Sequence, residues 1–118
     1  MIVNYYMLSN TGLYVQGRLK EIIKVKGYQV APTELEEIIR NYENVQDVAV
    51  VGVAHDDYGE IPKAFVVPKP GKKINENQLK EFVAKHVAKY KRLGYIQIIE
   101  SIPKTASGKI LRKELQNL

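Results

Sequence analysis

The spacing of apolar residues predicts a helix over residues 33–43. Four apolar residues recur there at intervals of three and four: Leu35, Ile38, Ile39 and Tyr42. This period places them on one face of a helix. Thr33 and Glu36 have the spacing of a capping box, so we expect Thr33 to cap the first turn and Glu36 to reach back to it.

A second helical pattern follows Asn75, which with Gln78 resembles another capping box. Its expected face consists of six residues: Leu79, Phe82, Val83, His86, Val87 and Tyr90. We expect His86 to be partly buried there, with its polar atoms satisfied. A short terminal helix is expected over residues 110–115.

Runs of β-branched residues predict the strands. Three runs are expected to form a small central sheet: residues 45–53, 63–67 and 95–99. Residues 54–62 are expected to be a polar loop, and residues 13–15 to pair with 22–26 as an N-terminal hairpin. Helices packed on about three strands, with a hairpin added, predict an α+β domain.

Composition narrows the class of protein. The chain has 118 residues, a formal charge of +5 and no cysteine, which excludes disulfides and thiolate metal sites. A basic chain favours anionic partners such as nucleotides, nucleic acid or acidic lipid. No run approaches the roughly 18 apolar residues of a membrane helix. Neither a secretory signal nor a C-terminal address is recognisable, so we expect a cytoplasmic protein.

The sharpest local feature is the segment Pro103–Lys109, where Gly108 permits a tight turn and Lys109 follows it. It is no Walker A loop, because Pro103 stands in place of the first glycine and Ile110 in place of the metal-binding hydroxyl residue. Its composition alone favours a solvated loop. The alternative is a lysine held at a loop tip, where it can reach an anionic group.

A basic stretch over residues 18–29 is the second feature. On a strand, Lys20, Lys24 and Lys26 share one face because side chains alternate. That face is either solvated or meets phosphate. The same alternatives apply to a second basic cluster: Lys85, Lys89, Lys91 and Arg92. The run His55-Asp56-Asp57 is better explained as a polar turn than as a metal site.

Two longer motifs resemble those of adenylate-forming enzymes, which include acyl-CoA synthetases, 4-coumarate–CoA ligases and firefly luciferase. Residues 17–36 are similar to the linker and first-helix motif of that family, and residues 103–112 to its C-terminal lysine motif. Gly52-Val53 and Gly59-Glu60-Ile61-Pro62 fit between them. The resemblance spans residues 13–118 and implies the small mobile C-terminal domain, preceded by an irregular segment at 1–12.

The resemblance also implies a chemistry. A carboxylate attacks the α-phosphate of ATP, giving acyl-adenylate and pyrophosphate, and the thiol of coenzyme A then displaces AMP. In this family Lys109 would serve the first step, Lys20 would be the hinge, and Lys24 would lie on the face presented for the second step. The implied nucleotide- and coenzyme-binding residues are Arg18, Lys26, Gly27, Tyr28, Gln29 and Gly108. From charge alone, Lys89, Lys91 and Arg92 are candidates for coenzyme A phosphates.

Mg²⁺ would accompany ATP, bound mainly by a large N-terminal domain that also holds the carboxylic acid. The family's ribose-binding Asp is missing, because Leu13 follows Thr11-Gly12, and Gly17 replaces another Asp. We expect the chain to be inactive by itself and to work with that domain in cis or in trans. The alternatives are a non-catalytic basic binding module, or a regulatory remnant of the same fold. Nucleic acid is not the expected partner, because the aromatic residues lie mostly at core spacing.

Overall fold

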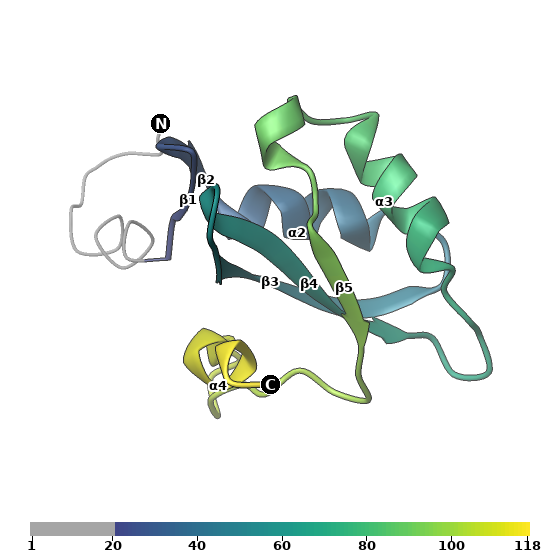
Figure 1. Ribbon diagram of the computed structural model, residues 1–118. Coiled ribbons are helices and arrows are strands. Elements are labelled where there is room, and N and C mark those ends of the chain that lie inside the picture. Colours follow the sequence, from purple (N-terminus) through teal and green to yellow (C-terminus); the bar gives the residue numbers. More distant parts are fainter. Residues whose placement is uncertain (1–20) are drawn as a thin grey trace, which may run out of the picture.

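One mixed sheet carries the other elements in the computed structural model, which describes residues 21–118 (Figure 1). Its strands are β1 (Ile23–Val25), β2 (Tyr28–Val30), β3 (Val45–His55), β4 (Gly59–Pro68) and β5 (Tyr95–Ile98). The order is β2-β1-β4-β3, and β5 pairs with β4. The pairing of β4 with β5 is parallel and the other pairings are antiparallel. The predicted α+β fold is confirmed, and residues 21–118 place five strands in a single sheet.

The helices cover both faces of this sheet. They are α2 (Pro32–Arg40), α3 (Glu76–Ala84), the 3₁₀ turn η1 (Lys89–Lys91) and α4 (Arg112–Gln116). Helices α2 and α3 lie on one face and α4 on the other (Figure 1). Neighbouring residues of β4 therefore enter different cores: Val66 packs with Leu35 and Leu79, whereas Phe65 packs with Leu115. No helix among residues 21–118 is long and apolar enough to cross a membrane.

The first predicted capping box is wrong. The N-cap of α2 is Ala31, with no side-chain cap, and Pro32 begins the helix. Glu36 is turned into the interior and is only 2% exposed. The second cap is confirmed, because Asn75 accepts a hydrogen bond of 2.9 Å from the backbone N–H of Gln78. His86 lies beyond α3 and is exposed, so its expected partial burial is also wrong.

Within residues 21–118, a hairpin is formed by β1 and β2. β1 pairs with β2 through a two-residue turn at Lys26 and Gly27, whose φ angles are 52° and 85°. Successive positive φ angles fit the twist of a tight hairpin. Residues 13–15 lie outside the described residues. The polar loop expected over 54–62 is shorter, since β3 and β4 pair up to His55 and Gly59.

Candidate functional site

The loop that carries Lys109 is closed by its own hydrogen bonds. Residues Lys104 and Ile110 form an antiparallel bridge at its base. Inside it, the Thr105 N–H donates to the Lys109 carbonyl at 2.8 Å, and the Gly108 N–H donates to the Thr105 carbonyl at 2.9 Å. The Thr105 hydroxyl accepts from the Lys109 N–H at 3.1 Å. Lys109 is exposed, so the loop presents its amine to solvent.

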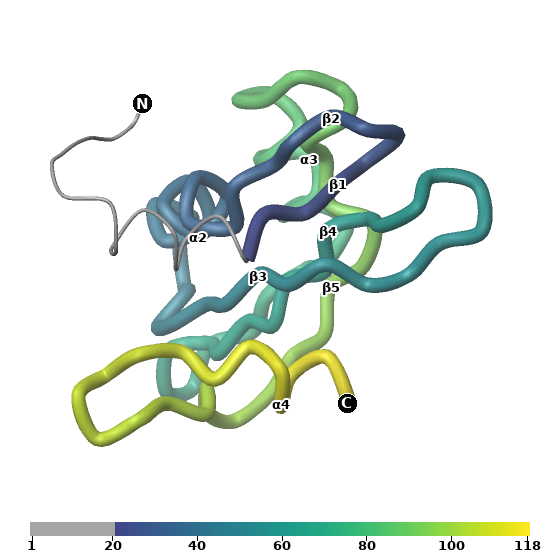
Figure 2. Tube along the Cα trace, turned by 90° about the vertical axis from the view of Figure 1, so that its left-hand side faces the viewer, coloured from purple at the N-terminus to yellow at the C-terminus, as the bar shows by residue number. Residues whose placement is uncertain are grey.

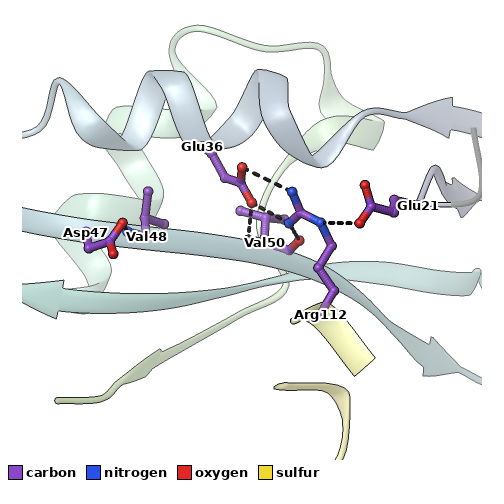
Figure 3. A network of polar contacts seen from close by, with 6 residues as sticks. All are labelled: Glu21, Glu36, Asp47, Val48, Val50 and Arg112. Carbon is purple, nitrogen blue, oxygen red and sulfur yellow. Dashed lines mark hydrogen bonds and ion pairs between the residues drawn. The ribbon is translucent and has the colours of Figure 1, made fainter. Parts of the chain in front are cut away.

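Side-chain contacts hold both ends of this loop against the sheet. At the amino end, the Lys104 amine lies 2.7 Å from a carboxylate oxygen of Asp47, on β3. At the carboxyl end, Arg112 reaches across β3 to the helix on the other side (Figure 3). The Leu111 N–H donates to the Pro103 carbonyl at 2.9 Å and closes the base.

Arg112 joins three segments of the chain (Figure 3). Its guanidinium donates to the Glu36 carboxylate of α2, to the Val50 carbonyl of β3 at 2.7 Å, and to Glu21 at 3.0 Å. Glu36 also accepts from the Val50 N–H at 2.8 Å. Burial alone lowers the pKa of Arg112, but the bonds and charges of Glu36 and Glu21 raise it above its ordinary value. The guanidinium therefore stays charged at physiological pH.

The hairpin presents a second basic surface. Ile23 and Val25 are buried while Lys24 between them is exposed, which confirms the predicted alternation. The Lys24 N–H donates to a carboxylate oxygen of Glu60 at 2.9 Å, which fixes β1 against β4. A Cβ added at Gly27 would meet no atom within 4 Å. Gly27 is therefore required by its positive φ, and its outer side is open.

A hollow of about 500 Å³ adjoins the hairpin turn. Its lining is partly apolar and includes three tyrosines and three basic residues: Lys26, Tyr28, Tyr58, Lys89, Tyr90 and Arg92. The Tyr28 ring stacks on the Tyr90 ring with centroids 4.4 Å apart, and the Lys26 amine lies 4.4 Å from the Tyr58 ring centroid. The apolar period predicts Tyr90 on a helix face, but α3 ends at Ala84 and Tyr90 lies in η1, while no sequence pattern marks Tyr58. No local pattern could have paired these residues, because they come from separate segments.

The other residues predicted from the sequence to bind the nucleotide or coenzyme A lie in different parts of the molecule. Gln29 is exposed on β2, and Gly108 has a φ of 92° in the lysine loop. Lys91 forms an ion pair of 3.0 Å with Glu34, so it differs from Lys89 and Arg92, which line the hollow. The lysine loop and the hairpin lie at opposite ends of the molecule in Figure 2. Arg18 and Lys20 lie outside the described residues.

The polar turn after β3 is not a metal site within the described part of the chain. The His55 ring stacks on Tyr58 and accepts a hydrogen bond of 3.2 Å from the Asp57 N–H. No group of three or more His, Cys, Asp or Glu side chains in residues 21–118 is arranged to hold a metal ion.

A family model described as the AMP-binding enzyme C-terminal domain matches residues 34–109, which run from α2 to the lysine at the loop tip. The chain belongs to this family. It is 50% identical over 113 residues to the 4-coumarate--CoA ligase-like 9 of Arabidopsis thaliana, covering 96% of this chain and 20% of that protein. It is 47% identical over 111 residues to the 4-coumarate:CoA ligase 1 of Petunia hybrida, covering 94% and 20%.

Solved structures agree with this membership. A fatty acyl CoA synthetase of Mycobacterium tuberculosis superposes with a TM-score of 0.79 at 35% identity, covering 85% of this chain and 20% of that one. The amide bond synthetase McbA of Marinactinospora thermotolerans gives 0.78 at 29%, covering 82% and 20%. The resemblance to the C-terminal domain of adenylate-forming enzymes is thereby confirmed. This AMP-binding enzyme C-terminal domain spans 20% of the length of the relatives named here.

Proposed function

We propose that this AMP-binding enzyme C-terminal domain is the mobile domain of an ATP-dependent acid–thiol ligase, and that it offers one surface to each half-reaction. The observation that carries the proposal is the exposure of Lys109 on a loop closed by its own hydrogen bonds. We propose that the domain comprises residues 13–118. Its first partner is a large N-terminal adenylation domain, joined in cis or supplied in trans.

In the first half-reaction, Lys109 acts from the loop tip. Attack of a carboxylate on the α-phosphate brings negative charges together, and a positioned ammonium stabilises them. The ammonium is a compact charge on a flexible stem, suited to contacting phosphate and carboxylate oxygens. Gly108 supplies the turn that presents it. We propose that ATP and its Mg²⁺ are held mainly by the N-terminal domain.

In the second half-reaction, the hairpin surface meets coenzyme A. Lys24 and Gln29 are exposed on this surface, and the open side of Gly27 leaves room for the pantetheine chain. The hollow beside the turn adds stacked rings at Tyr28, and its basic residues Lys89 and Arg92 suit the coenzyme phosphates. Lys26 lies on the same hollow.

The lysine loop and the hairpin lie at opposite ends of the molecule in Figure 2, which supports a rotation of the domain between the half-reactions. Lys20 is the proposed hinge, which absorbs the backbone change, and Arg18 is proposed to contact the nucleotide ribose. The isolated chain is inactive because the acid and most of ATP bind elsewhere. We propose a cytoplasmic location, as expected from the sequence.

The test joins this chain to the part of the Petunia hybrida ligase that it does not match. A parallel sample mixes the two pieces unjoined, and each piece is also tested alone. Pyrophosphate release and thioester formation are followed with 4-coumarate, ATP and coenzyme A. Both products should form in the joined protein, and neither piece should form them alone. Lys109→Ala should lower pyrophosphate release on the order of 10²–10³-fold, as does loss of an oxyanion donor.

The matched control is Lys113→Ala, which removes an exposed lysine four positions away and should leave both rates unchanged. Activity that persists in Lys109→Ala contradicts the assigned role of this lysine. If no combination is active while RNA binds the chain in a salt-dependent way, the chain is a basic binding module instead.

A further inference from the structure

Arg112 attaches the carboxyl end of the lysine loop to the rest of the domain. It stands three residues after Lys109, at the start of α4. Helix α4 is short and covers one face of the sheet (Figure 1). The Arg112 side chain is nevertheless only 12% exposed. The donor groups of its guanidinium reach Glu36 on α2, Val50 on β3 and Glu21 just ahead of β1.

We propose that Arg112 is a positioning residue for Lys109, which locks the carboxyl end of the lysine loop to the sheet so that loop and sheet move as one body. The inference rests on the proposed function, in which Lys109 must be carried into a nucleotide pocket. A lysine on a loosely attached loop would reach that pocket in many orientations. Misplacement of a reacting group by about 1 Å can cost on the order of 10²-fold in rate.

Arginine suits this position because of its geometry. Its planar fork has five donors in fixed directions, so one side chain can bind acceptors on three segments at once. Glu21, just ahead of β1, is one of these acceptors. A lysine at position 112 keeps the charge opposite Glu36 but offers a single nitrogen. Arg112→Lys therefore removes the several fixed donor groups of the guanidinium but keeps a positive charge opposite the buried Glu36 carboxylate.

The first experiment needs no activity. In the 118-residue chain, ¹⁵N relaxation reports the order of residues 105–111. With arginine at position 112, their order parameters should be close to the value of about 0.85 typical of a rigid backbone. In Arg112→Lys they should fall toward the value of about 0.6 that marks flexible segments. The strands β3 and β4 should keep theirs. An unchanged loop overturns the proposal.

The second experiment separates the half-reactions in the joined protein described above. Arg112→Lys should slow acyl-adenylate formation on the order of 10-fold to 10²-fold. Thioester formation from preformed acyl-adenylate should be unchanged, because the hairpin surface is attached through Glu60 instead. Arg112→Met should show the same bias more strongly, provided that its circular dichroism is that of the folded protein. Lys113→Met, which removes the neighbouring exposed charge, should change neither rate.

Equal losses in both half-reactions make Arg112 a merely structural residue and overturn the proposal. The same holds if Lys113→Met slows adenylation selectively, since charge rather than position would then matter. The proposed function fails separately, when Lys109→Ala leaves adenylation intact or the joined protein is inactive. The order parameters decide the positioning role even then.

Discussion

Glu36→Gln tests how much the buried ion pair contributes to folding. The Glu36 side chain is 3% exposed and that of its partner Arg112 is 12% exposed. The substitution keeps the shape of the side chain and an acceptor for the Val50 N–H. It removes the negative charge that compensates the guanidinium in the interior. The matched control is Glu34→Gln on the same helix, which breaks the exposed pair with Lys91.

The expected magnitudes differ because the two pairs differ in burial. Removing one partner of a buried pair costs about 3–5 kcal/mol, and we expect about 3 kcal/mol here because the Arg112 guanidinium keeps Glu21 and the Val50 carbonyl. Glu34 is 44% exposed, so its pair should contribute less than about 1 kcal/mol. The free energy of unfolding of a small domain is about 5–15 kcal/mol in total. The loss expected for Glu36→Gln is therefore a large fraction of it.

Urea unfolding followed by far-ultraviolet circular dichroism measures both changes in the 118-residue chain, which has no tryptophan for fluorescence. Glu36→Gln should lower the unfolding free energy by about 3 kcal/mol and Tm by about 10 °C. The slope of the transition should stay constant, which shows that the compactness of both states is unchanged. A loss in Glu36→Gln no larger than that in Glu34→Gln would refute the reasoning, because the buried pair would then contribute no more than a surface pair.

Three further outcomes are expected. In partial reactions of the joined protein, Lys109→Ala should slow acyl-adenylate formation far more than acyl transfer to coenzyme A. Lys24→Ala should slow the transfer more than the adenylation. Equal losses in both reactions would contradict the assignment of one surface to each half-reaction. Asn75→Ala removes the cap of α3 and should lower the unfolding free energy by about 1 kcal/mol in a urea titration. Gly94→Ala places a Cβ 2.5 Å from the Cδ1 atom of Ile61, so thermal unfolding should show a loss of about 1–3 kcal/mol, and an unchanged Tm would mean that Ile61 repacks freely.

Local patterns predicted most of the secondary structure. The helices around Leu35 and Leu79 and the strands at 45–53, 63–67 and 95–99 all exist, since an apolar period fixes which face of an element is buried. The predicted ends of the helices and strands differ from those in the structure. The turn between β3 and β4 is polar, but pairing across it continues to Gly59, because backbone groups near a sheet gain partners there.

Glu36 shows where this reading fails. A carboxylate three residues after a threonine fits a capping box, and the spacing contains nothing to distinguish that from burial. The residue that decides its role is Arg112, 76 positions away. Only the packing of α2 and α4 on opposite sides of β3 brings the two together. Similarly, the hollow beside the hairpin joins Tyr28 and Tyr90 from separate segments.

The sequence by itself determined what depends on neighbours along the chain: the two longer helices, the strands at 45–53, 63–67 and 95–99, and the loop that presents Lys109. These follow from backbone sterics and from the periods of helix and strand, which act over a few residues. The tertiary structure alone decided which charged side chains are buried together and which residues hold the ends of the lysine loop against the sheet. Such contacts join distant segments, and their partners are set by how the apolar faces pack against one sheet.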